Sequence, residues 1–212
     1  FYSSKQTISF FDNLIDDYCK KSNIICYRGS LEDVLDRYYQ AAKLYNADPI
    51  LRITADCPMI DPSIIDKVVN MHVEGDYEVT GLTGEFPDGL DVEVFNFEAL
   101  TTAWHSAKLP SEREHIGQYF YNNPEKFKLG SYIAFTDKSE YRWTLDYIED
   151  FEFINQVYTK LYHSNHFFNT NDIFKLLESN PELMTLNSNI IRNEGLIKSL
   201  EREKNYQRSN IK

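Results

Sequence analysis

The stretch Pro49–Pro62, PILRITADCPMIDP, constrains the fold of this chain more than any other. Its short apolar run ends in an acid and two prolines, which is the pattern of a buried strand that stops at a polar site. Asp61 can then cap a helix that has Pro62 in its first turn. In open α/β sheets, ligands bind beyond the carboxyl ends of the strands. Asp56 is therefore placed to bind a cation or a sugar hydroxyl, with simple capping of the turn as the alternative.

Length and composition indicate one folded domain, because 42% of the 212 residues are hydrophobic and 15% are aromatic. The formal charge of -11 argues against a nucleic acid or an anionic membrane as partner, since such contacts need clustered Lys and Arg. No apolar run approaches the roughly 18 residues of a membrane span and no signal-peptide pattern is present, so we expect a cytoplasmic protein. The cysteines lack C-x-x-C spacing, which favours reduced thiols over a zinc site. They are Cys19, Cys26 and Cys57.

The apolar spacing predicts alternating helices and strands, and hence the α/β class. We expect helices over residues 7–21, from Ser30 onward, after Asp61, after Asn96, after Ser111, over 148–161 and after Thr170. Capping boxes are expected at Ser30 with Asp33 and at Ser111 with Glu114. We expect strands over 24–27, 50–53, 77–80, 91–95, 127–135 and 141–145, and a mobile loop over 81–89. The charged end from about Asn187 is expected to pack loosely.

Acids follow or line several of these predicted strands. Asp91 and Glu93 alternate with valines and share one face, which lines a pocket or is solvated. Asp146 follows residues 141–145 as Asp56 follows its own strand. If Asp56 and Asp146 lie about 5 Å apart, an effective dielectric near 20 gives a repulsion of roughly 3 kcal/mol. A magnesium ion would offset it, because Mg²⁺ binds one or two carboxylates together with water and substrate phosphates, and this favours nucleotidyl transfer.

Five segments in order resemble the bacterial cytidylyltransferases of the spore-coat polysaccharide type, relatives of the CMP-3-deoxy-octulosonate and CMP-sialic acid synthetases. The segments are YRGSLEDVLDRYYQAA, LRITADCPMIDP, PDGLDVEVF, SEREHIGQYF and YRWTLDYIEDFEFI, and the resemblance covers nearly all of residues 12–190. It implies a Rossmann-like three-layer α/β/α sandwich of the nucleotide-diphospho-sugar transferase type. It also implies transfer of CMP from CTP to a sugar acid, with release of pyrophosphate. Homodimers are common among such enzymes, so a homodimer is an open expectation.

The resemblance further implies roles for individual residues. The magnesium ligands and catalytic residues would be Asp56 and Asp146. Gly29 and Ser30 would contact the nucleotide, since glycine permits close approach. Arg37 and Arg52 would bind the nucleotide or the sugar carboxylate, since guanidinium suits both phosphate and carboxylate. Residues on the sugar side would be Asp88, Glu93, Glu114 and His115, with Arg142 near the magnesium. Taken alone, His115 is more often a structural histidine than a catalytic one.

One departure from the family pattern concerns the amino end. Family members begin with a strand and a Gly/Arg/Lys-rich loop around the CTP phosphates, whereas this chain starts at Phe1 in a predicted helix. We therefore expect a transferase-like domain over 1–190 without its first strand and loop, a charged tail over 191–212, and weak or no turnover from these residues alone. Two alternatives stay open. One is a metal-dependent glycosyltransferase that uses a UDP-sugar, because Asp91-Val92-Glu93 approximates D-x-D. The other is a non-catalytic module that binds a nucleotide-sugar or a partner enzyme.

Overall fold

The structure is a computed structural model that describes residues 8–210, with backbone alone for residues 8–12 and 205–210. The chain divides into two compact units. Of the described residues, unit 1 contains 8–50, 95–129 and 195–210, and unit 2 contains 51–94 and 130–194. Each unit has its own buried side chains, and the predicted catalytic aspartates belong to unit 2.

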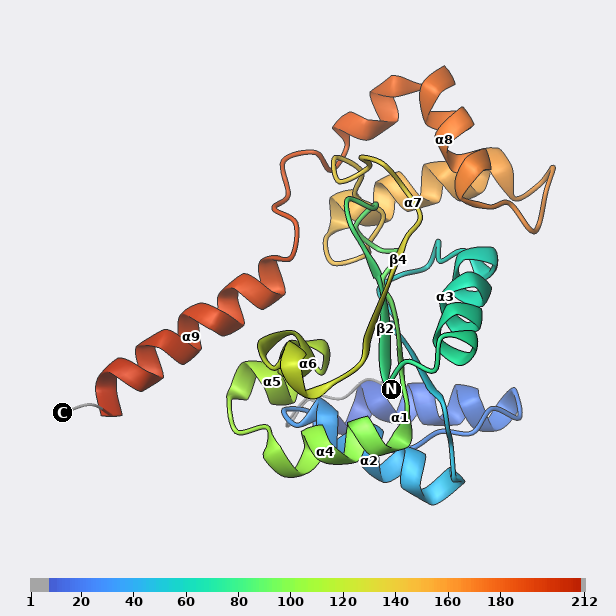
Figure 1. The fold of residues 1–212 in the computed structure, drawn as a ribbon. Coiled ribbons are helices and arrows are strands. Elements are labelled where there is room, and N and C mark those ends of the chain that lie inside the picture. Colours follow the sequence, from blue (N-terminus) through green and yellow to red (C-terminus); the bar gives the residue numbers. More distant parts are fainter. Residues whose placement is uncertain (1–7, 211–212) are drawn as a thin grey trace. The chain divides into compact units, whose positions relative to one another are not determined.

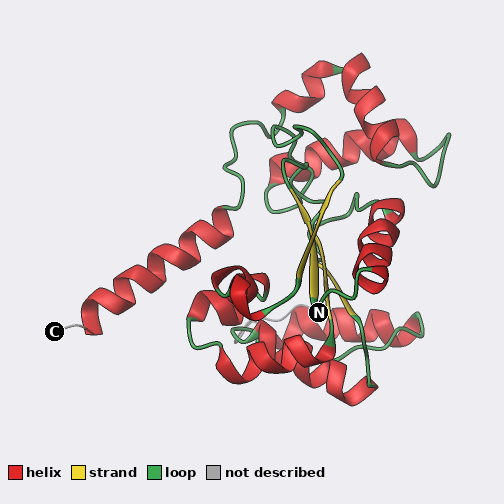
Figure 2. Ribbon diagram, viewed as in Figure 1, coloured by secondary structure: helices red, strands yellow, loops and turns green. Residues whose placement is uncertain are grey.

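Unit 2 is built on a four-stranded sheet, whose strands are yellow in Figure 2. The strand order is β1-β3-β2-β4. The strands are β1 (Ile50–Ile53), β2 (Val79–Thr83), β3 (Val92–Phe95) and β4 (Leu129–Ile133). Only the end residues Ile50, Phe95 and Leu129 fall in unit 1. The helices of unit 2 are α3 (Pro62–Glu74), α7 (Ile148–Leu161) and α8 (Thr170–Ser179), with a 3-10 turn, η2, at Pro181–Thr185. This mixture of a central sheet and helices confirms the predicted α/β class.

Helix α3 begins as the sequence predicts. The Asp61 side chain accepts a hydrogen bond from the backbone N–H of Ser63 at 2.8 Å, and Pro62 occupies the first helical position. The helix buries Ile64 and Val68, and Figure 1 shows it beside β2. The short connection between β1 and α3 is therefore fixed at both ends, and Asp56 lies within it.

Unit 1 is mainly helical. Its helices are α1 (Ile8–Lys21), α2 (Val34–Tyr45), α4 (Phe97–Ser106), α5 (Pro110–Glu114), α6 (Gly117–Asn122) and α9 (Glu194–Asn210, from Gly195 on), with a 3-10 turn, η1, at Pro124–Lys126. Helices α2 and α4 pack together through Tyr39 and Trp104, whose rings stack 4.2 Å apart. The Trp104 indole N–H donates to Asp36 at 2.7 Å, which satisfies its polar edge.

Three strand predictions need correction. Residues 24–27 form no strand in the described part of the chain, and Ile24 and Ile25 are 54% and 68% exposed. An apolar run is a strand only where another strand pairs with it. Strand β2 begins two residues after the predicted start and continues to Thr83, into the stretch that was expected to be a mobile loop. Residues 141–145 are extended, but only an isolated parallel bridge between Asp88 and Arg142 pairs them.

Neither expected capping box caps a helix. The Ser30 hydroxyl accepts from the backbone N–H of Asp33 at 3.1 Å, but helix α2 starts at Val34, and Asp33 caps it by accepting from the backbone N–H of Asp36. The helix expected after Ser111 is instead two short helices, α5 and α6. Ser111 lies inside α5 behind Pro110, which occupies the first helical position there.

The prediction for the carboxyl end did not foresee a helix. Residues 194–210 form α9, whose Ser199 is buried. The predicted helix over 7–21 is α1, and the side chains of its first residues, 8–12, lie outside the described part of the chain. Among the described helices, none is long and apolar enough to cross a membrane.

Candidate functional site

Three of the segments singled out in the sequence come together in unit 2. The backbone of Asp88 exchanges two hydrogen bonds with residues 141–143, of 2.9 and 2.7 Å. Farther along, the backbone N–H of Leu145 donates to the carbonyl oxygen of Asp56 at 2.8 Å, and the Thr144 hydroxyl donates to the same oxygen at 3.2 Å. The residue that precedes Asp146 is thus in direct contact with Asp56.

Gly89 is required for this approach. Its φ of +98° lies in the region that favours glycine. A Cβ built on Gly89 would lie 2.5 Å from the carbonyl carbon of Trp143 and from the amide nitrogen of Thr144. These are backbone atoms that cannot move aside alone, so the PDG turn needs glycine at its third position.

Arg142 lies at the centre of a hydrogen-bonded network, buried except for Asp146, that we call the Arg142 cluster. The cluster comprises Asp88, Arg142, Asp146, Asp150 and Asn187. The guanidinium donates through Nε and Nη2 to both oxygens of Asp150 at 2.8 Å, through Nη2 to Asp146 Oδ2 at 2.9 Å, and through Nη1 to Asp88 Oδ2 at 3.0 Å. Asn187 Nδ2 donates to Asp150 Oδ1 at 2.9 Å and to the carbonyl oxygen of Arg142 at 3.0 Å.

The charges of the cluster do not balance. Three carboxylates face one guanidinium, a formal charge of -2 (1 − 3), before Asp56 is counted. Burial raises the pKa of Asp88 to about 6, and the charge of Asp91 adds to this, against the opposing charges of Arg192 and Arg142. Burial would also raise the pKa of Asp150, but the hydrogen bonds from Arg142 and other donors outweigh it and lower that pKa. The cluster is therefore a place of excess negative charge, which favours a cation.

Asp56 and Asp146 are accessible enough to bind an ion. Asp56 is half-buried, and the Asp146 side chain is 48% exposed although Arg142 holds its Oδ2. Among the described residues, no group of three or more His, Cys, Asp or Glu side chains has the arrangement of a metal site. The residues present fit a magnesium ion held by two carboxylates and completed by water and phosphate, not an all-protein cage. Joint binding of one ion by Asp56 and Asp146 remains a prediction.

Other predicted residues of unit 2 lie close to this region in sequence and have structural partners. Arg52 on β1 forms a salt bridge of 2.9 Å with Glu93 on β3, and both side chains are largely buried. The pair joins one residue predicted to contact nucleotide with one predicted to face the sugar. Cys57 is buried beside the Thr54 hydroxyl, and burial raises the pKa of its thiol to about 12. Its thiol therefore stays protonated near neutral pH, which excludes Cys57 as a nucleophile there.

The predicted nucleotide residues of unit 1 form a group of their own. Arg37 is buried and donates through Nη1 to the carbonyl oxygen of Ser30 at 3.0 Å. A Cβ on Gly29 would lie 3.0 Å from Arg37 Cγ, so the small residue lets the arginine pack against the turn. This gives Arg37 a structural task in shaping the Gly29-Ser30 turn, and a direct contact with nucleotide remains a prediction.

Glu114 and His115, predicted to face the sugar, both contact α9. The Ser199 hydroxyl donates to Glu114 at 2.7 Å and lies 3.2 Å from His115 Nε2. Glu203, one turn farther on, accepts from the backbone N–H and the hydroxyl of Ser111, at 3.2 and 2.6 Å. Helix α9 therefore packs on the SEREH segment within unit 1.

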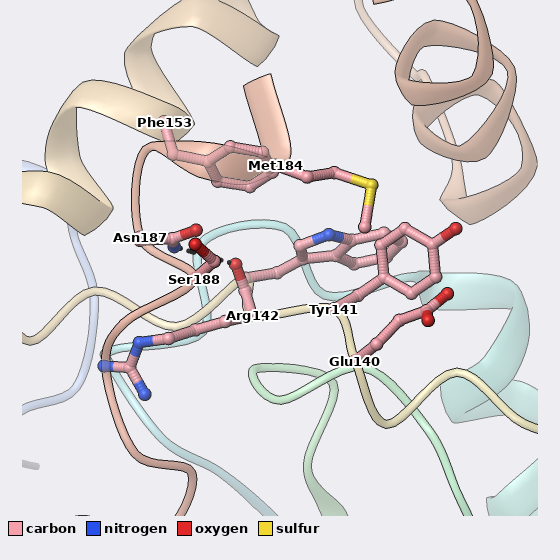
Figure 3. A pocket seen from close by; sticks show the side chains of 8 residues that line it. Glu140, Tyr141, Arg142, Phe153, Met184, Asn187 and Ser188 are labelled. Atoms are coloured by element: carbon pink, nitrogen blue, oxygen red, sulfur yellow. Dashed lines mark hydrogen bonds between the residues drawn. The ribbon is translucent and has the colours of Figure 1, made fainter. Parts of the chain in front are cut away.

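The sequence interpretation missed Asp150 and Asn187. Asp150 has a local signal, because it stands three residues into α7 and accepts from the N-cap Tyr147 backbone N–H at 3.0 Å, as a capping-box acid does. Asn187 has none, since it joins the cluster from 37 residues away. Asn187 also lines a pocket with Tyr141, Phe153, Met184 and Ser188, in which the guanidinium of Arg142 extends away from the aromatic rings (Figure 3).

Comparison with known proteins agrees with the resemblance. The family model described as Cytidylyltransferase matches residues 7–179. An uncharacterized protein of Methanocaldococcus jannaschii, MJ1063, is 36% identical over 192 residues, which cover 87% of this chain and 75% of that protein. The spore coat polysaccharide biosynthesis protein SpsF of Bacillus subtilis is 27% identical over 187 residues, which cover 86% of this chain and 75% of SpsF.

A solved structure is similar as well. The structure of a cytidylyltransferase from Leptospira borgpetersenii matches with a TM-score of 0.79 and 33% sequence identity, over 89% of this chain and 77% of that chain. The agreement extends from the order of the motifs to the arrangement of the backbone. This chain belongs to the cytidylyltransferase family and is a nucleotidyltransferase.

Proposed function

We propose that this protein transfers CMP from CTP to a sugar acid and releases pyrophosphate, with a magnesium ion held by Asp56 and Asp146. The observation that carries the proposal is the 2.8 Å hydrogen bond from the Leu145 N–H to the Asp56 carbonyl. It joins two segments that are 90 residues apart at the points where each carries its aspartate. If the two carboxylates also lie close together, they repel each other unless a cation or a proton lies between them.

The chemistry needs a negative site that can accept a metal-bound nucleotide. A sugar hydroxyl oxygen attacks the α-phosphorus, the bond to the bridging oxygen of pyrophosphate breaks, and the hydroxyl proton is released. A bound magnesium ion would neutralise phosphate charge and stabilise the pyrophosphate leaving group. Asp56 and Asp146 would hold the ion, while Arg142 fixes the half-exposed Asp146 carboxylate through Oδ2.

The remaining predicted contacts are part of the proposal for each unit. In unit 2, the Arg52–Glu93 pair and the buried Asp88 would face the sugar acid, because a guanidinium can bind its carboxylate and carboxylates can accept its hydroxyls. In unit 1, two groups of residues would serve the nucleotide and the sugar. They are Gly29, Ser30 and Arg37 for the nucleotide, and Glu114 and His115 for the sugar.

The product would enter the synthesis of a surface polysaccharide. SpsF, a relative over 86% of this chain, is a spore coat polysaccharide biosynthesis protein, and an activated sugar is what such a pathway consumes. A homodimer and a cytoplasmic location also remain predictions.

Pyrophosphate release tests the proposal. The purified protein is incubated with CTP, magnesium and a panel of 2-keto sugar acids, and products are identified by mass spectrometry. We expect release of pyrophosphate that is weak in these residues alone, that depends on magnesium and on one class of sugar acid, and that is lost in Asp56→Asn and Asp146→Asn. Glu149→Gln removes an exposed carboxylate three residues from Asp146 and is the matched control. Turnover that survives both aspartate substitutions, or UDP release from a UDP-sugar in place of CMP transfer, would refute it.

A further inference from the structure

We propose that Asp150 and Asn187 are positioning residues for Asp146. The inference rests on the proposed function, because it concerns the cation that Asp146 would bind. The new element is that Asp150 and Asn187, which would not contact the ion, set the geometry of Asp146. One of them, Asn187, lies beyond residues 7–179, the part of the chain that the family model matches.

Asp150 fixes the turn that carries Asp146. Its side chain is fully buried and takes part in five hydrogen bonds. Two come from Arg142 and one from Asn187, while Oδ2 also accepts from the backbone N–H groups of Asp146 and Tyr147, both at 3.0 Å. The carboxylate thus holds the backbone of Asp146 directly and its side chain through Arg142.

Arg142 transmits this constraint to the Asp146 carboxylate. Its Nη2 donates to Asp150 Oδ2 at 2.8 Å and to Asp146 Oδ2 at 2.9 Å, so the guanidinium fixes the two acids relative to each other. Among the residues that the structure describes, no donor is hydrogen-bonded to Asp146 Oδ1. One carboxylate oxygen is therefore held by protein, and the other is left for an ion.

Asn187 holds the opposite side of the network. It is 4% exposed and donates to Asp150 Oδ1 at 2.9 Å. It also donates to the Arg142 carbonyl oxygen at 3.0 Å, and Figure 3 draws this second hydrogen bond. An amide fits here because both acceptors need a donor, and a carboxylate would repel Asp150. The segment that follows α8 is thereby part of the support of the site.

Manganese binding tests the inference without turnover. Mn²⁺ replaces Mg²⁺, and the unbound ion is measured by electron paramagnetic resonance during titration of the free protein. Loss of a residue that orients a metal ligand typically weakens binding 10- to 100-fold, so we expect at least a tenfold loss in Asp150→Asn and Asn187→Ala. Two controls should stay within twofold of wild type. Glu149→Gln removes the same charge from the same turn of α7, and Ser188→Ala changes the exposed neighbour of Asn187.

The outcomes separate this inference from the proposed function. One outcome would overturn the inference and leave the proposed function standing. In it, Asp150→Asn and Asn187→Ala bind Mn²⁺ as tightly as the wild type, while Asp56→Asn and Asp146→Asn lose binding. Undiminished binding in Asp56→Asn and Asp146→Asn, or no binding by the wild type, would contradict the function itself. Circular dichroism checks folding, and if Asp150→Asn unfolds, Asn187→Ala decides because it keeps all three ion pairs of Arg142.

A second measurement excludes a merely structural effect. In the transfer assay, we expect Asn187→Ala to raise the magnesium concentration needed for half-maximal rate at least fivefold and to regain most of the wild-type rate at saturating magnesium. A lower rate with unchanged magnesium dependence would contradict a positioning role.

Discussion

Replacing Gly89 with alanine tests the close approach that assembles the site. At Gly89 a new Cβ would meet the backbone of Trp143 and Thr144 at 2.5 Å, and φ is +98°. Gly84 provides a matched comparison in the same unit, because its φ is +82° but its Cβ would meet only side-chain atoms of Ile133, at 3.3 and 3.8 Å. Gly84→Ala therefore measures the cost of the backbone conformation, and Gly89→Ala measures that cost plus the clash.

The expected magnitudes follow from these contacts. A Cβ at positive φ costs about 1–2 kcal/mol, which is what we expect for Gly84→Ala. In Gly89→Ala the clash can be relieved only by separating Asp88 from residues 141–143, which breaks their two backbone hydrogen bonds of 2.9 and 2.7 Å. At about 1 kcal/mol each, this adds about 2 kcal/mol, so we expect a loss of about 3–4 kcal/mol in the free energy of unfolding.

Urea unfolding followed by tryptophan fluorescence provides the assay. In a Trp104→Phe background, the buried Trp143 is the one remaining tryptophan and reports on unit 2. Gly195→Ala is the control, because no heavy atom lies within 4 Å of its Cβ position in α9, and we expect no change in the Trp143 transition. If Gly89→Ala and Gly84→Ala lower the free energy of unfolding by amounts within about 0.5 kcal/mol of each other, the argument for the close approach is wrong.

Three further predictions concern the charges and the thiol of unit 2. Arg142→Met should lower the free energy of unfolding by about 3–5 kcal/mol, because it leaves Asp88 and Asp150 buried without their ion-pair partner. Arg192→Met should lower it clearly less in the same urea assay, because this half-buried arginine donates to backbone carbonyls and acts on Asp88 through its charge. The pKa of Asp88 is raised from 3.8 to about 6, so the folded state binds the extra proton and loses stability as pH rises between these values. Between pH 4 and 7, the free energy of unfolding of the wild type should therefore fall by up to about 3 kcal/mol more than that of Asp88→Asn. An equal pH dependence of unfolding in the two proteins would contradict this. With its pKa at about 12, Cys57 should react with iodoacetamide at pH 8 about a thousandfold more slowly in the folded than in the urea-unfolded protein, as mass spectrometry of labelled peptides would show.

Local signals predicted much of the fold. The start of α3 was predictable because Asp61 and Pro62 act within one turn of the helix they begin, and Asn96 caps α4 in the same way. Pairing was not predictable from local pattern. Residues 24–27 have the apolar character of a strand yet form none in the described chain, whereas β2 keeps its ladder through Gly81 because its neighbours supply partners.

In the site, too, local features were predictable from sequence and long-range partners were not. Asp56 and Asp146 were recognisable because each follows an apolar run at a turn, a pattern within a few residues. The cluster around Arg142 could not be read from sequence, since Asp88 and Asn187 reach it from 54 and 45 residues away. Likewise, Ser111 looked like a helix cap, but its hydroxyl donates to Glu203, 92 residues away. Tertiary partners of this kind decided where sequence pattern and structure differ.

The most direct test of the central claim is a crystal structure of the protein with CTP and Mn²⁺, with data collected at the manganese absorption edge. We expect an anomalous peak about 2.1 Å from one oxygen of Asp56 and from one oxygen of Asp146, with the α-phosphate as a further ligand. A manganese ion bound to only one of the two carboxylates, or held at neither while CTP is bound, would contradict it.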